Sequence, residues 1–115
     1  MDKHSFTLKG QLPAKKNAWK VGRYGIYQSK SKEIDVFIFQ LKEQVRQYPD
    51  LPLLKDCKIE VVLHQSNRTD LDGQITTLCD ILQTSGVVKN DRQIKNIVAQ
   101  KIVDNKNPRV EVNIF

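Results

Sequence analysis

Apolar side chains recur with two different periods along this chain, one typical of strands and one typical of helices. This combination limits the folds that the chain can adopt. In residues 58–64 the apolar side chains Ile59, Val61 and Leu63 occupy every second position. A period of two places such side chains on one face of an extended strand. Residues 110–114 alternate in the same way. The chain therefore contains at least two strands that each bury one face.

Two other segments have the spacing of helices. The first starts at residue 31 or 32 and ends at residue 48, with apolar residues 3, 4, 7, 11 and 14 positions after the first of them. The second starts at residue 69 or 70 and ends near residue 83, with offsets of 4, 7 and 11. Each pattern forms one apolar stripe on a helix. Asp70 is a favourable residue for the start of the second helix, and Gly86 is suited to end it.

The remaining segments add strands to this framework. Residues 6–12 alternate, and residues 91–103 are rich in Ile and Val. The expected order is strand, basic loop over residues 14–31, helix, strand, helix, strand, strand, with the last two strands paired antiparallel through a polar turn at residues 104–107. Two helices on one face of a mixed sheet are an economical arrangement for so short a chain. The sequence therefore predicts an α+β fold, a two-layer α/β sandwich, as a single domain over residues 1–115.

Positive charge is concentrated near the amino terminus. Residues 1–32 contain eight Lys or Arg and one Asp, whereas the rest of the chain contains eleven basic and twelve acidic side chains. A basic segment of this kind binds a phosphate backbone by releasing counterions, without sequence preference. We expect a loop dotted with aromatic residues and a short strand near Tyr27. Trp19 and Tyr24 either stack on opened bases or anchor the loop.

Some classes of protein are excluded by the same composition. No apolar run approaches the roughly 20 residues needed to cross a bilayer, and the chain begins with a polar segment. We therefore expect a cytoplasmic protein without membrane attachment. Cys57 and Cys79 lack a CxxC spacing or a histidine-rich neighbourhood, so we expect two reduced, buried thiols rather than a zinc site.

The segment Arg68-Thr69-Asp70-Leu71-Asp72-Gly73 carries the most informative chemistry. It places two aspartates between a strand end and a helix start, where both carboxylates can point the same way. The N–H groups and the dipole of the helix start favour ionised carboxylates. Mg²⁺ binds through one or two carboxylates and keeps waters for a phosphate substrate. Helix capping alone is the simpler alternative for this pair.

Asp91 is expected to complete the acidic set, because it follows the turn after the second helix and can return to the sheet edge that carries Asp70. An ordinary turn residue is the alternative. We expect Asp70, Asp72 and Asp91 to bind Mg²⁺ and to catalyse phosphodiester hydrolysis with a metal-bound water as nucleophile. Asp80 recurs with Asp72 and Thr76 at intervals of four, so it would support the site from the same helix face or serve the structure alone.

Basic side chains near this acidic set, and in the loop before it, are expected to contact DNA phosphates. Some belong to the amino-terminal loop, and the others are close in sequence to the three aspartates. The expected contacts are Lys15, Lys16, Arg23, Lys30, Arg68, Lys89 and Arg92.

With these residues in view, the chain resembles the RusA family of Holliday-junction resolvases over most of its length. The family pattern is Asp-x-Asp-Asn, a Lys three positions later, Asp-x-Leu, a Gly, and an acidic-Asp-x-Gln-Ile segment. The matching residues here are Asp70-Leu71-Asp72-Gly73, Thr76, Asp80-Ile81-Leu82, Gly86 and Asn90-Asp91-Arg92-Gln93-Ile94. More loosely, residues 13–17 resemble the family's amino-terminal proline-asparagine loop, and Lys101 with residues 108–112 resembles its closing hairpin.

The resemblance implies a Mg²⁺-dependent endonuclease that makes paired nicks in a four-way DNA junction during recombination and repair. It also implies a homodimer, as in the small enzymes of this family that are common in prophages. Asp70, Asp72 and Asp91 match the family's metal-binding carboxylates. Two symmetric cuts need two sites related by a two-fold axis, which agrees with a dimer.

Two positions depart from the family pattern. Gly73 replaces an Asn, and Thr76 replaces a Lys that would hold phosphate or stabilise charge in the transition state. Lys89, Arg92 and Lys101 are candidates to supply the missing charge. The departures leave a second hypothesis open, a junction-binding or nucleic-acid-binding relative with weak or no catalysis. A third and less favoured hypothesis is a protein-interaction subunit whose basic face meets an acidic partner.

Overall fold

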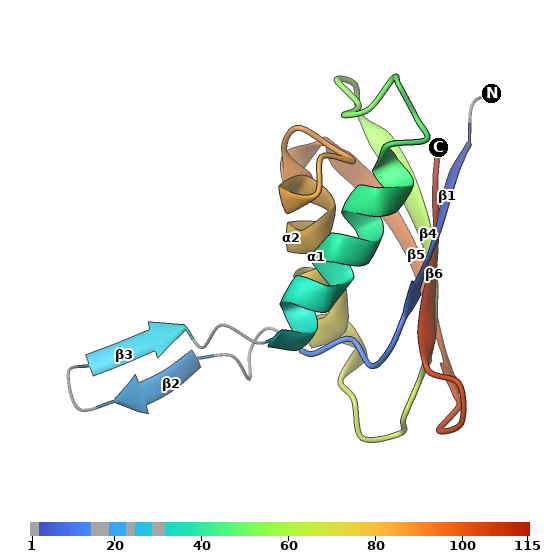
Figure 1. Cartoon of the computed structure of the whole chain (residues 1–115). Coiled ribbons are helices and arrows are strands. Elements are labelled where there is room, and N and C mark those ends of the chain that lie inside the picture. The colour runs from blue at the N-terminus through green and yellow to red at the C-terminus, as the bar shows by residue number, and fades with distance from the viewer. Residues whose placement is uncertain (1–2, 15–18, 23–24, 29–31) are drawn as a thin grey trace.

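A mixed sheet of four strands carries two helices on one of its faces (Figure 1). The computed structural model describes residues 3–14, 19–22, 25–28 and 32–115. The sheet and helices are β1 (His4–Lys9), α1 (Lys32–Val45), β4 (Cys57–Gln65), α2 (Leu71–Thr84), β5 (Ile94–Val103) and β6 (Arg109–Ile114). This arrangement confirms the predicted α+β fold with two helices on one face.

The order of strands in the sheet corrects one prediction. The order is β1-β6-β4-β5, with β6 antiparallel to both β1 and β4, and β5 parallel to β4 at the edge. The predicted antiparallel hairpin of β5 and β6 is therefore wrong. The reason is burial, because β6 buries Val110, Val112 and Ile114, whereas most side chains of β5 are exposed. The strand with the fully apolar inner face takes the central position, and β5 takes the edge.

The amino-terminal strand is shorter than predicted. It ends at Lys9 because Gly10 adopts a φ of 117°, a conformation that L side chains rarely adopt. Gly10 then donates its N–H to the carbonyl of Pro108 at 2.9 Å. In the basic segment, β2 (Trp19–Gly22) and β3 (Gly25–Gln28) pair as an antiparallel ribbon that stands away from the sheet (Figure 1). The strand expected near Tyr27 is β3, and β2 was not predicted.

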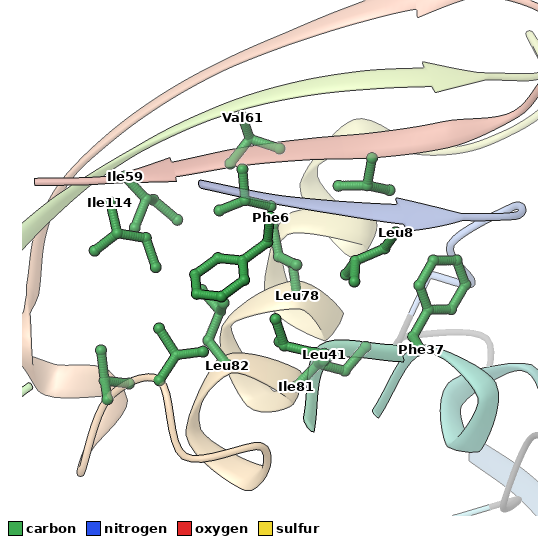
Figure 2. Close-up of a cluster of buried hydrophobic side chains, with 14 of the residues drawn as sticks. Phe6, Leu8, Phe37, Leu41, Ile59, Val61, Leu78, Ile81, Leu82 and Ile114 are labelled. Carbon is green, nitrogen blue, oxygen red and sulfur yellow. The ribbon is translucent and has the colours of Figure 1, made fainter. Parts of the chain in front are cut away.

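The core lies between the sheet and the helices. The helix stripes predicted from sequence supply Phe37 and Leu41 from α1 and Leu78 and Leu82 from α2. Complete burial of one such side chain stabilises the fold by about 1.5–3 kcal/mol. Figure 2 shows these side chains meeting the inner face of the sheet, whose labelled members are Phe6, Leu8, Ile59, Val61 and Ile114.

The two edges of the sheet differ. Along β1, Gln40 of α1 accepts from the Lys9 N–H at 2.7 Å and donates to the Lys9 carbonyl at 2.9 Å. Gln44, one turn later, makes the same two contacts with Thr7 at 3.1 and 2.7 Å. These side-chain amides take the place of a neighbouring strand, so the β1 edge is closed to pairing. The opposite edge, β5, pairs only with β4 among the described strands.

The end of α2 follows the prediction. Ser85 caps the helix, and Gly86 follows it with a φ of 85°. Among the described residues, no helix combines the length and the apolar character needed to span a membrane.

Candidate active site

A groove of about 510 Å³ runs between the start of α2 and the edge strand β5. On the helix side it is lined by Asp70, Asp72 and Thr76, with two apolar neighbours from the same turns. Ile97 and Ala99 of β5 form the other wall. The Asp-x-Asp segment therefore directs two residues into one open groove, as the sequence predicts.

The local chain path explains why both aspartates reach this groove. β4 ends at Gln65, and a turn closed by Thr69 on the carbonyl of Ser66 leads into α2. Asp70 occupies the N-cap position in an extended conformation, but its side chain makes no capping hydrogen bond. Asp72 lies exposed in the first turn, where the helix dipole favours a negative charge. Capping alone therefore does not account for Asp70.

Two buried glutamines fix the start of α2 to the amino-terminal segment. Gln65 accepts from the N–H of Leu12 at 2.6 Å and donates to the carbonyl of Gly10 at 3.0 Å. Gln74 donates to the carbonyl of Leu12 at 2.7 Å and to the side-chain oxygen of Gln65 at 3.0 Å. Both glutamines are fully buried, so these bonds are shielded from water. The residues that lead into the basic segment are thereby held against the end of β4 and the start of α2.

This support was missed from the sequence, although one signal was present. Gln65 continues the alternation of the inward-facing residues of β4, so it is a polar residue at a core position. A buried amide needs hydrogen-bond partners. That need points to a nearby loop, but it does not identify which one.

Gly73 has a packing reason in this chain. A Cβ added there would lie 2.8 Å from the Cβ of Ala14, closer than real carbon atoms approach, and 3.6 Å from Oδ2 of Asp70. The amino-terminal segment therefore lies directly against the first turn of α2. The Asn of the family pattern would not fit against Ala14 in this packing.

Substitution of Gly73 by Ala is expected to destabilise the protein by about 1–3 kcal/mol, because the added methyl group overpacks the contact with Ala14. Urea unfolding of the single variant measures this change. The double variant with Ala14→Gly and Gly73→Ala removes the clashing methyl group and is expected to recover most of the loss. Equal stability of Gly73→Ala and the parent protein would show that the segment does not press on the helix.

Lys101 extends from β5 to the start of α2. Its register partner on β4 is the buried Leu63, so its side chain lies on the helix-covered side of the sheet. Its ammonium donates to the carbonyl of Thr69 at 2.5 Å, and the residue is half-buried. Thr69 immediately precedes Asp70, so this contact places a positive charge at the end of the groove.

Asp91 lies at the other end of α2. It begins the short helix η2 (Asp91–Gln93), and its N–H donates to the side chain of Gln83 at 2.9 Å. The predicted strand from residue 91 begins only at Ile94. Burial raises the pKa of the Cys79 thiol to about 11, with smaller contributions from the charges of Asp91 and Asp80. Asp80 and Asp91 therefore share the neighbourhood of Cys79.

The structure thus brings together two of the three predicted metal ligands within one chain. No group of three or more His, Cys, Asp or Glu side chains in the described ranges is arranged to hold a metal ion. The pair Asp70 and Asp72 fits Mg²⁺ nevertheless, because this ion binds through one or two carboxylates and leaves positions for water and phosphate. The roles of Asp70, Asp72, Asp91 and Asp80 in catalysis remain predictions.

The predicted DNA contacts divide between the two ends of α2. Arg68 is exposed in the turn beside the groove, whereas Lys89 and Arg92 are exposed near Asp91. The other expected contacts, together with Tyr24, lie outside the described residues, namely Lys15, Lys16, Arg23 and Lys30.

Comparison with known proteins agrees with this arrangement. The family model described as endodeoxyribonuclease RusA matches residues 3–115, which is nearly the whole chain. A search of curated proteins gave no match. The matched region contains the groove, both buried glutamines and all three aspartates. The chain therefore belongs to the RusA family of endodeoxyribonucleases.

Proposed function

We propose that this protein is a Mg²⁺-dependent endonuclease that nicks four-way DNA junctions by phosphodiester hydrolysis. The observation that carries the proposal is the placement of Asp70 and Asp72 on one groove, in a chain that matches the RusA family over nearly its full length. Family membership supplies the class of reaction, and the paired carboxylates supply a place for it.

Residues in and beside the groove support this proposal. Asp70 and Asp72, at the start of α2, would hold Mg²⁺. The bound metal ion would supply a nucleophilic hydroxide and neutralise charge on the phosphate. Arg68 stands beside this groove and would hold the DNA backbone through its guanidinium.

The open edge of the sheet supports a homodimer. β5 is ten residues long and exposes Ile97, Val98, Ile102 and Val103, with 56% of Val98 and 54% of Val103 accessible. A long apolar edge strand readily pairs with another chain. Because the β1 edge is closed by Gln40 and Gln44, we propose that two copies join through β5.

Such a dimer would also bring Asp91 of one chain close to Asp70 and Asp72 of the other. Antiparallel pairing about a two-fold axis sets the beginning of one β5 alongside the end of the other. Asp91 stands just before the beginning of β5, and the Lys101 contact ties the end of β5 to the Asp70 segment. In this arrangement the partner subunit's Asp91 approaches the groove that holds Asp70 and Asp72. Each groove would then draw carboxylates from both chains.

A labelled four-way junction incubated with and without Mg²⁺ tests the function. We expect nicks in the junction with Mg²⁺, none in EDTA, and little cutting of a linear duplex of the same sequence. Binding in EDTA should weaken steeply as salt rises, because the basic residues contact phosphates. Salt-sensitive binding without cutting in Mg²⁺ or Mn²⁺ would instead identify a binding-only relative, and an absence of binding would favour a protein partner.

A further inference from the structure

On the side of β5 that faces α2, one charged residue, Lys101, stands among apolar side chains. Ile97, Ala99, Lys101 and Val103 follow one another at every second position on this side of the strand. Three of them are apolar, as expected for a strand that lies beside a helix. The half-buried Lys101 of this row has a specific hydrogen-bond partner.

The partner seen in the structure uses only part of the ammonium. Lys101 donates to the carbonyl of Thr69 at 2.5 Å, and an ammonium has three N–H donors. The carbonyl contact fixes the position of the charge next to Asp70, at the end of the groove. This contact uses one of the three donors, so two remain for a further acceptor beside Asp70.

The described residues that line the groove include no cation. Of the described residues that form its walls, two are aspartates, one is Thr76 and the others are apolar. The hydroxyl of Thr76 donates to the carbonyl of Asp72 at 3.1 Å, so it is already engaged with the helix backbone. Lys101, at the end of the groove, is therefore placed to add positive charge beside the two carboxylates.

We propose that Lys101 binds the reacting phosphate and stabilises the charge that develops on its oxygens during hydrolysis. A positioned ammonium acts in this way because it is held in place before the reaction begins. The contact with Thr69 provides that fixed position. This inference rests on the proposed nuclease function and assigns a residue within it.

The variant Lys101→Gln separates charge from structure, because an amide still donates to a carbonyl but carries no charge. We expect Lys101→Gln to keep the melting temperature nearly unchanged and to weaken junction binding in EDTA only slightly, because it removes one phosphate contact among several. The single-turnover rate of cutting in Mg²⁺ should fall by about 100-fold or more. Lys101→Arg should retain more activity, and Lys42→Gln, at an exposed position of α1, serves as the control.

A second variant tests whether a positive charge elsewhere in the groove can replace that of Lys101. Thr76 lies on the opposite wall, so Thr76→Lys returns an ammonium to the same groove. Adding Thr76→Lys to Lys101→Gln should restore the cutting rate by about 10-fold or more. A lysine that only ties β5 to the turn would give lower stability without rescue, and that result would overturn the inference.

The same experiment distinguishes the role of Lys101 from the proposed nuclease function. If the wild-type protein cuts and Lys101→Gln cuts within about threefold of it, the role of Lys101 is refuted while the nuclease stands. If the wild-type protein does not cut the junction, both proposals fall together.

Discussion

Replacement of Asp72 by Asn is expected to slow Mg²⁺-dependent cutting of a four-way junction by about 100-fold to 1,000-fold. Asp72 is exposed in the first turn of α2 and faces the groove, so its carboxylate is accessible to a metal ion and to substrate. Asparagine has nearly the same shape but lacks the charge that holds Mg²⁺. The defect should therefore appear in the rate and in the dependence on Mg²⁺ concentration.

The fold should tolerate this change. An exposed aspartate in the first helical turn stabilises the helix by about 0.3–1 kcal/mol through the dipole, so the melting temperature should fall only slightly. Glu43→Gln provides a matched control, because Glu43 is also a helical carboxylate and pairs with the exposed Arg46. Junction affinity in EDTA should be retained in both variants. Cutting at the wild-type rate by Asp72→Asn would remove the groove as the catalytic centre.

A mixture of Asp72→Asn and Asp91→Asn chains is expected to recover activity that neither variant has alone. If each site combines Asp72 of one chain with the partner subunit's Asp91, a mixed dimer contains one complete site and one doubly defective site. Random pairing of equal amounts makes half of the dimers mixed, so about a quarter of the wild-type number of sites returns. These dimers should nick one strand of the junction rather than two.

The physical basis for this result is that Asp72 and Asp91 of one chain lie at opposite ends of α2. Asp91 contacts Gln83 near the end of the helix, whereas Asp72 lies in its first turn. The chains should be mixed by co-expression with two different tags, so that mixed dimers can be isolated and assayed alone. If isolated mixed dimers are as inactive as the two parents, the sites do not combine residues from two chains, and pairing through β5 loses its functional argument.

The local elements of this fold could be predicted because their signals are local. The alternation that defines β4 and the stripe that defines α2 are visible in single segments, and each boundary agrees with the structure within two residues. The Asp-x-Asp pair could also be located, because its placement depends only on a strand end and a helix start.

Pairing between distant segments could not be read in the same way. The neighbours of β5 and β6 depend on which strand buries more surface, and a short polar turn between them suggested a hairpin that does not form. The separation of Asp91 from Asp70 follows from the parallel pairing of β5 with β4, which carries the start of β5 to the far end of α2. The buried contacts of Gln65 and Gln74 likewise join segments more than fifty residues apart. These strand pairings and long-range contacts depend on how the whole core packs, so no single segment of sequence predicts them.

The most direct test of the proposed function is a map of the nicks that the wild-type protein makes in each of the four strands of a junction. The proposal predicts that Mg²⁺ produces two nicks, in opposite strands and at positions related by the two-fold symmetry of the junction. The same strands should remain intact in EDTA or when annealed as linear duplexes. No cutting in any divalent metal, or equal cutting of junction and duplex, would contradict a structure-specific junction endonuclease.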